Sequence, residues 1–368
     1  MVRYTTREDD LDAITTALMG SVALRTADAV VAGGDSLPLL QRLPDQSVSL
    51  ILTDPPYHST KKGNIYGDKD FQEDEHFIKW MEAYAAEWKR VLRASGTVYV
   101  FCSSEMSARL EVMISKHLRP LNHITWTKPN EPGFDGWKGK MNKEALRRWY
   151  PHSERILVFE HGVYGTFEAY RRSPLGEYLL HCRKKAGISG HALTGAIGAY
   201  GKVNHGGAVS NWEAGRNTPS REQYQKIVEV LEATGKVGKM LPYEDIVRPL
   251  NVHGGIEFTD VWDFMSVRPY KGKHPAEKPL DMLRHIISAS SYPGDIVLDC
   301  FAGSGAAGVA ALQLGRRAVC MEIEDQWVAR CSEDLTRVAP IPEEKVRLAP
   351  VRRLPAVSGQ LALDPLFD

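Results

Sequence analysis

Four consecutive residues, Asp54-Pro55-Pro56-Tyr57, combine groups that could activate an amine. The two prolines stiffen the turn and remove two backbone N–H donors, so nearby carbonyl oxygens stay free to accept hydrogen bonds. The Asp54 carboxylate and the Pro55 carbonyl could then accept both hydrogens of a nucleobase amine, whose delocalised lone pair makes it a poor nucleophile. Tyr57 could stack on the extruded base. We therefore predict that this loop is catalytic; an ordinary proline turn is the alternative for the loop alone.

A second motif, Gly303 to Gly308, matches the pattern G-x-G-x-x-G, and Glu322 ends the next apolar segment. Such glycines let the backbone approach a ligand and expose amides at a helix N-terminus, while an acid like Glu322 accepts hydrogen bonds from ribose hydroxyls. The pattern alone suits a dinucleotide equally well. Asp299, before the loop, favours S-adenosylmethionine, because a carboxylate holds the cationic amino-acid end of that molecule and would repel a pyrophosphate. A loop-bracing role is the alternative for Asp299.

Both motifs follow short apolar runs, residues 48–53 and 295–298. Runs of this kind are typical of buried parallel strands, which deliver loops at their carboxyl ends. In open α/β sheets ligands bind at that edge. The sequence therefore predicts that Asp54 and Asp299 lie in one site, although they are far apart in the chain.

Strand-like and helix-like segments alternate around these motifs. The predicted strands are residues 29–32, 96–101 and 318–321, and the predicted helices are residues 37–43, 74–92, 106–117, 279–287 and 306–314. This βαβ rhythm predicts an α/β fold, with a Rossmann-like, mostly parallel sheet and helices on both faces.

The βαβ rhythm weakens after about residue 130 and resumes near residue 258, which predicts a mainly helical insertion in the sheet domain. The insertion carries clusters of basic residues, and a solvated surface is the alternative interpretation of each cluster. The predicted division is an N-terminal extension (1–27), a first catalytic part (28–130), the insertion (131–257), a second catalytic part (258–340) and a C-terminal tail (341–368).

The composition is that of an ordinary globular protein. The chain has 368 residues, of which 43% are hydrophobic, and this is enough for a sizeable core. Its formal net charge of zero counts against a globally basic nucleic-acid-binding protein, so any such surface must be local. The five cysteines show no Cys-x-x-Cys spacing, which predicts a reducing cytoplasm and no metal site. We expect no signal peptide and no membrane partner.

With these residues in view, the chain resembles amino-type DNA methyltransferases of the circularly permuted class, in which Asp-Pro-Pro-Tyr precedes the methyl-donor motif. The resemblance covers residues 28–130 and 258–332 and includes the segment His274 to Pro279. It implies S-adenosylmethionine as cofactor and double-stranded DNA as partner, in the cytoplasm and associated with the nucleoid. It also leaves open a homodimer and a cognate restriction endonuclease.

The resemblance implies roles for individual residues. The loop Asp54 to Tyr57 would hold the target base, and its first Asp favours adenine, because cytosine-specific relatives more often have Ser there. Glu322 would bind the ribose, with Glu324 and Asp325 as alternatives. The implied donor-site residues are Lys278 and Pro279 beside the methionine end, Asp35 near the adenine, and Asp299, Phe301, Gly303, Ser304, Gly305 and Glu322.

Within the insertion, residues 180–232 resemble a repressor-type helix-turn-helix, whose second helix enters the major groove. On this interpretation Val209 and Trp212 pack inward and the insertion is the target-recognition region. A long stretch, residues 199–207, separates the two helices, so a small bracing helical unit is the alternative. The predicted contacts to bases or phosphates are Arg183, Lys184, Lys185, Ser210, Asn211 and Arg216.

The resemblance and the residues together predict methyl transfer from S-adenosylmethionine to the N6 amine of adenine in DNA. Methylation of the N4 amine of cytosine is the alternative within the same chemistry. Methylation at a cytosine ring carbon is excluded, because it needs a thiolate that usually follows a proline, and no cysteine here does. Two other classes stay open: a helix-turn-helix regulator with an inactive methyltransferase fold, and a nucleotide-dependent oxidoreductase, which leaves the Asp54 loop unexplained.

Overall fold

The computed structural model describes residues 7–58, 73–128, 142–145, 147, 149, 152–162, 173–199, 207–251 and 259–341. Its strands are β1 (Val22–Arg25), β2 (Ala29–Gly33), β3 (Val48–Thr53), β4 (Leu92–Cys102), β5 (Arg119–Thr127), β6 (Ser153–Glu160), β7 (Val261–Asp263), β8 (Ile296–Asp299) and β9 (Arg317–Glu322). Its α-helices are α1 (Arg7–Ala17), α2 (Ser36–Arg42), α3 (Asp74–Val91), α4 (Ser107–Ile114), α5 (Pro174–Ala186), α6 (Gly190–Ala196), α7 (Ala208–Glu213), α8 (Arg221–Glu232), α9 (Tyr243–Ile246), α10 (Leu280–Ser290), α11 (Ala306–Gln313) and α12 (Asp325–Thr336).

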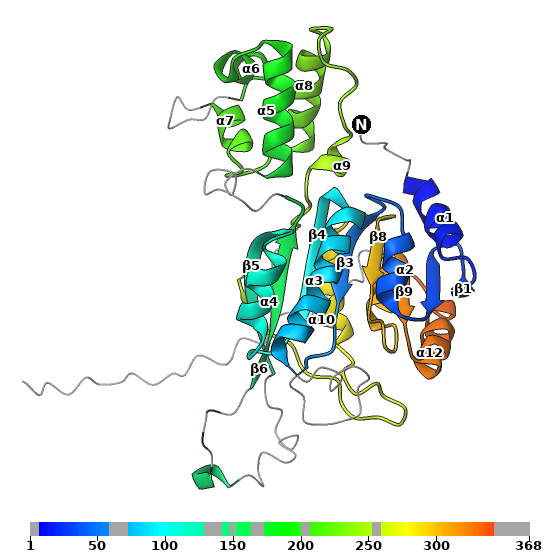
Figure 1. Cartoon of the computed structure of the whole chain (residues 1–368). Coiled ribbons are helices and arrows are strands. Elements are labelled where there is room, and N and C mark those ends of the chain that lie inside the picture. The colour runs from blue at the N-terminus through cyan, green and yellow to red at the C-terminus, as the bar shows by residue number, and fades with distance from the viewer. Residues whose placement is uncertain are drawn as a thin grey trace, which may run out of the picture.

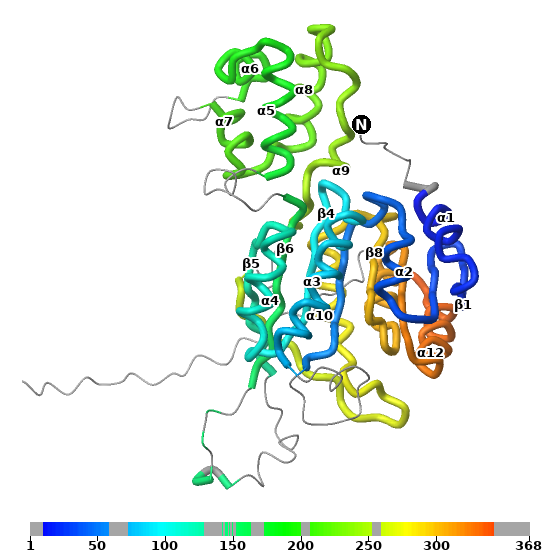
Figure 2. The backbone as a smooth tube through the Cα atoms, in the orientation of Figure 1, coloured from blue at the N-terminus to red at the C-terminus, as the bar shows by residue number. Residues whose placement is uncertain are grey.

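The strands form one sheet in the order β1-β2-β9-β8-β3-β4-β6-β5-β7. The five strands from β2 to β4 in this order run parallel, whereas β6 is antiparallel to both of its neighbours. At the centre β3 pairs with β8, with Leu50 opposite Val297 and Ile51 opposite Leu298. The two ends of the chain therefore build one sheet, and Figure 2 shows the late helix α12 beside the early strand β1.

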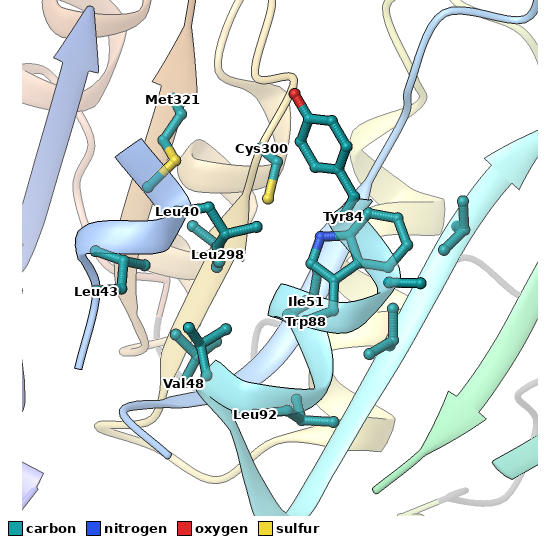
Figure 3. Packing of buried hydrophobic residues seen from close by; sticks show 14 of the residues in the cluster. Leu40, Leu43, Val48, Ile51, Tyr84, Trp88, Leu92, Leu298, Cys300 and Met321 are labelled. Carbon is teal, nitrogen blue, oxygen red and sulfur yellow. The ribbon is translucent and has the colours of Figure 1, made fainter. Parts of the chain in front are cut away.

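Two layers of helices cover the sheet, as the alternation of side chains along a strand requires. Ile51 and Leu298 face the core formed with α1 to α4, and Leu50 and Val297 face the core formed with α10 to α12. Figure 3 shows Trp88 of α3 packed near Ile51 in the first of these cores. The predicted α/β fold with helices on both faces is confirmed.

The predicted domain boundaries need two corrections. The range 131–257 was assigned to the insertion, but β6 lies within it and pairs along its length with β4 and β5. The sheet also extends into the predicted N-terminal extension, because β1 pairs with β2. Of the predicted tail, only Ile341 belongs to the part of the chain that the structure describes.

Helices α5 to α8 form a separate helical module with its own core, in which Leu179, Trp212, Tyr224 and Ile227 are buried. The module lies at one end of the sheet, beyond the start of β4 (Figure 1). The connecting helix α9 is fixed there because Ser95 of β4 donates a hydrogen bond to the Glu244 carbonyl at 2.8 Å. Within the described ranges, none of the helices is long and apolar enough to cross a membrane.

The central pairing of β3 with β8 makes Leu298 a test of the fold. Its side chain is fully buried, and Leu298→Ala should destabilise the protein by about 2–5 kcal/mol, because it removes apolar contacts and leaves a cavity. Chemical denaturation measures this loss. Val112→Ala on α4 is the control, since Val112 is 71% exposed and should change stability by less than about 0.5 kcal/mol. Equal effects of the two substitutions would contradict the assigned core.

Candidate active site

A cavity of about 510 Å³ opens at the carboxyl ends of the central strands. Both motifs line it, so the structure brings Asp54 and Asp299 together at one cavity, as the sequence predicted. The predicted site residues that line this cavity are Asp35, Asp54, Pro55, Pro56, Tyr57, Lys278, Asp299, Phe301, Gly303, Ser304 and Glu322.

Two of the predicted donor-site residues, Gly305 and Pro279, do not line the cavity. Gly305 precedes α11 with φ of +82°, and a Cβ atom there would lie 2.6 Å from the Cys331 Sγ of α12. A glycine is needed at this position because another helix approaches the backbone closely. Pro279 is the residue before α10. Each directly precedes a helix, and neither contributes to the cavity wall.

Backbone amides of the Gly-rich loop and the β9 end hold the Glu322 carboxylate. Gly303 N–H donates to its Oε2 at 2.7 Å, and Ile323 N–H and Glu324 N–H each donate to its Oε1 at 2.9 Å. Burial raises the pKa of Glu322, and these amides oppose the rise. Glu322 is thus a rigid acceptor at the end of β9 that faces the cavity.

Asp299 is tied to the strand that carries the other motif. Thr53 Oγ1 donates to Asp299 Oδ1 at 3.0 Å and accepts from Cys300 N–H at 3.3 Å, while Phe301 N–H donates to the same Oδ1 at 3.1 Å. Burial raises the pKa of Asp299 to about 7. A cationic ligand group beside this carboxyl would favour its ionised form.

These residues fit S-adenosylmethionine. Asp299 and Glu322 provide acceptors for an ammonium group and for ribose hydroxyls, and Gly303, with φ of +51°, leaves bare backbone where a Cβ atom would lie 3.0 Å from the His274 ring. Phe301 forms an apolar wall with Tyr84, at a centroid distance of 5.0 Å. A pyrophosphate would instead be repelled by the two acids, so this set of groups disfavours a dinucleotide.

Asp35 and His274 also line the cavity wall, and each has a local structural partner. Asp35 caps α2 by accepting a hydrogen bond from Leu37 N–H at 3.1 Å. His274 lies edge-on to Trp327, and Ala276 N–H lies 3.3 Å from its Nδ1. Burial lowers the pKa of His274 to about 4, so the ring is neutral near pH 7.

In the Asp54 loop, the two carboxylate oxygens differ in their surroundings. Lys278 Nζ donates to Asp54 Oδ2 at 2.5 Å. Asp54 Oδ1 is buried and has no hydrogen-bond partner among the residues that the structure describes. Burial raises the pKa of Asp54, while the Lys278 ammonium opposes this rise. One oxygen of Asp54 is therefore paired with Lys278, and the other is a buried acceptor, without a hydrogen-bond partner among the described residues, on a side chain that lines the cavity.

The expected place of Lys278 beside the methionine end of the donor stays a prediction, and the structure shows its ammonium next to the Asp54 loop. Its ammonium bonds Asp54 and lies 5.2 Å from the ring centroid of Tyr57 and 5.1 Å from that of Phe101. The side chain is only 9% exposed. Lys278 thus belongs to the wall that carries the Asp54 loop.

Sequence reasoning missed Glu154, which lies at the start of β6. Tyr57 donates its hydroxyl hydrogen to Glu154 Oε2 at 2.8 Å, and Lys278 Nζ lies 3.7 Å from the same oxygen. The apolar run 156–159 is typical of a strand, although these residues fall in the range predicted as a mainly helical insertion. Even a predicted strand would not have shown that its start lies beside Tyr57.

The predicted DNA-contacting residues lie on the helical module and not at the cavity. Lys184, Lys185, Ser210 and Arg216 are exposed there, and Asn211 is partly exposed and accepts a hydrogen bond from Arg216 at 3.1 Å. The predicted inward packing of Val209 and Trp212 is confirmed. Of the long stretch between α6 and α7, residues 200–206 lie outside the described part of the chain.

The predicted phosphate contact of Arg183 is not supported by its surroundings. Its guanidinium donates to both carboxylate oxygens of Glu213, at 2.5 and 2.8 Å, and to the Ile188 carbonyl at 2.9 Å. Only 15% of the side chain is exposed. These bonds join α5 to α7, so Arg183 stabilises the module.

Several known proteins are similar to this chain in sequence or fold. The family model described as DNA methylase matches residues 48–333. The chain is 28% identical to DNA adenine methyltransferase YhdJ of Escherichia coli (strain K12) over 80% of its length and 78% of that protein. It is 22% identical to type II methyltransferase M2.DpnII of Streptococcus pneumoniae, covering 81% and 86%. The fold resembles that of PvuII DNA methyltransferase (cytosine-N4-specific), with TM-score 0.51, 17% identity, and coverage of 89% and 92%.

The raised pKa of Asp299 predicts how stability depends on pH. The folded carboxyl holds its proton up to about pH 7, whereas the ordinary value is 3.8. Its contribution to stability is therefore fully present below pH 3.8 and is lost as the pH rises through 7. Asp299→Asn keeps an acceptor oxygen but cannot titrate, so from pH 5 to pH 8 its stability should rise relative to the wild type by on the order of 2 kcal/mol. Urea unfolding of both proteins at the two pH values measures the difference, and a constant difference would contradict the buried titration.

Proposed function

Because the chain belongs to the DNA methylase family, whose methyl donor is S-adenosylmethionine, we propose that its target is the N6 amine of adenine in DNA. The observation that carries the proposal is the unpaired oxygen Asp54 Oδ1: it is buried on a residue that lines the same cavity as Asp299 and Glu322. A hydrogen-bond acceptor in this place suits an amine whose lone pair is delocalised into a ring, because accepting its N–H makes the nitrogen more nucleophilic.

Two observations favour adenine over cytosine. The catalytic loop begins with Asp54, where cytosine-specific relatives more often have Ser. The E. coli relative is named a DNA adenine methyltransferase. The N4 amine of cytosine is the second candidate, because it presents the same pair of hydrogens and the loop would accept them in the same way.

In the proposed mechanism the protein positions the target amine and accepts hydrogen bonds from it. Asp54 Oδ1 and the Pro55 carbonyl each accept a hydrogen bond from one N–H group of the amine, so the nitrogen lone pair is freed from conjugation with the ring. Lys278 keeps the carboxylate oriented through Oδ2. Tyr57 provides a stacking face for a base extruded from the duplex. S-adenosylmethionine, when bound, supplies the electrophilic methyl group.

Asp54→Ala should lower the rate of methyl transfer by at least about a hundredfold, because it removes an acceptor that acts on the target amine. Binding of S-adenosylmethionine, measured by calorimetry, should remain nearly unchanged. The matched variant is Asp299→Ala on the neighbouring strand, which should weaken donor binding. Full activity of Asp54→Ala would exclude the mechanism, and unchanged donor affinity of Asp299→Ala would remove that residue from the donor site.

Mass spectrometry of nucleosides tests the base. Methylation-free plasmid DNA is incubated with the purified protein and S-adenosylmethionine, then digested. N6-methyladenine is the expected product. N4-methylcytosine would keep the mechanism and overturn the choice of base, and the absence of both products together with absent donor binding would favour a DNA-binding regulator.

As part of the proposed function, Lys184 and Lys185 on the helical module contact DNA phosphates. Lys184→Ala/Lys185→Ala should weaken DNA binding and reduce the slope of log affinity against log salt by about 0.9 for each phosphate that is no longer neutralised. Lys226→Ala/Lys239→Ala removes the same charge from exposed positions outside α5 and serves as control. Fluorescence anisotropy with a labelled duplex measures both slopes. Equal slopes for the two variants would favour the alternative, in which the module only braces the sheet.

A further inference from the structure

Glu154 contacts two groups of the candidate catalytic wall at once. Its Oε2 accepts the Tyr57 hydroxyl at 2.8 Å and lies 3.7 Å from the Lys278 ammonium. Its Oε1 is ion-paired with Lys128. The carboxylate lines the cavity with only 18% of the side chain exposed. Both of its oxygens are therefore engaged with groups at the cavity wall.

The direction of β6 places Glu154 there. Because β6 is antiparallel to β4, it begins at the edge where the parallel strands end, with Arg155 opposite Cys102. On its other side Glu154 is paired with Trp126 of β5. A side chain on a strand held by two neighbours has little freedom, so it can fix the groups that contact it.

Glu154 is a second carboxylate that attracts the Lys278 ammonium. The ammonium lies between Asp54 Oδ2, at 2.5 Å, and Glu154 Oε2, at 3.7 Å. Burial disfavours the charge of Glu154, but Lys278 and Lys128 outweigh this and lower the pKa of the carboxyl, so it is ionised near pH 7. A second carboxylate keeps the ammonium from interacting with Asp54 alone.

We propose that Glu154 is a positioning residue of the methyl-transfer site, which orients the Tyr57 ring for the extruded base and holds Lys278 so that Asp54 keeps Oδ1 open. This inference rests on the proposed function. It assigns to β6, whose start lies at the end of β4, a part in arranging the Asp54 loop.

The test compares two substitutions that remove different parts of this role. Glu154→Gln keeps an acceptor for the Tyr57 hydroxyl but removes the charge that attracts Lys278; Glu154→Leu removes both. We expect single-turnover methylation of plasmid DNA to fall by about tenfold for Gln and about a hundredfold for Leu, because the reacting groups are displaced. The affinity for S-adenosylmethionine should stay unchanged.

A double-mutant cycle separates positioning from a general loss of structure. Tyr57→Phe should slow the wild type but change the Glu154→Leu variant by less than about twofold, because the two substitutions break the same contact. Glu160→Gln is the matched control: Glu160 lies on the same strand, is buried, and pairs with Arg119 and Arg248 at the opposite edge. It should keep the wild-type methylation rate.

Three results would overturn the inference: a wild-type rate for Glu154→Leu, additive effects in the cycle, or a loss of rate matched by an equal loss of donor affinity. Crystal structures of the wild type and Glu154→Leu without DNA give a readout that does not depend on activity. The Tyr57 ring should be displaced in the variant, and an unmoved ring would reject the positioning role. If the wild type itself does not methylate DNA, the proposed function fails, and the structures still decide the role of Glu154.

Discussion

The parallel pairing of β3 with β8 is the contact on which the rest of the site depends. These strands come from opposite ends of the chain, and their register brings Asp54 and Asp299 to the same edge. Thr53 completes the link by donating to Asp299 Oδ1 at 3.0 Å. A shift of one residue would turn Leu50 and Ile51 toward the wrong cores. Burial of both faces therefore fixes the geometry of the two loops before any ligand binds.

A second constraint is electrostatic. Asp54 and Glu154 share the Lys278 ammonium in a wall from which water is largely excluded. Burying such charges is costly unless each is paired and hydrogen-bonded. Here Lys128 and the Tyr57 hydroxyl satisfy Glu154. The buried oxygen of this group that has no hydrogen-bond partner among the described residues is Asp54 Oδ1. The costly unpaired atom of the free protein is therefore the one to which the proposed function assigns a hydrogen bond from the target amine.

The sequence predicted those parts of the molecule that depend on local pattern. Apolar runs predicted the strands β3 and β8, and glycines predicted the donor loop. The position of both motifs at one edge of the sheet could be predicted from these. Side-chain partners far apart in the chain could not be predicted. Arg183 was expected at a phosphate because it lies in a basic cluster, but its partner Glu213 is thirty residues away. Glu154 depends on the position of β6 in the sheet, which no local pattern encodes.

The position of the helical module limits what it can recognise. Its connecting helix α9 is anchored to Ser95, at the start of β4, while the cavity lies beyond the other end of that strand. The seven steps along the strand from Ser95 to Cys102 span roughly 23 Å at the rise of a β-strand. A base held by the Asp54 loop is therefore out of reach of Ser210 and Asn211. If the module binds DNA, it must bind a stretch away from the extruded base, so it would contribute affinity, and the choice of target base would rest with groups at the cavity edge.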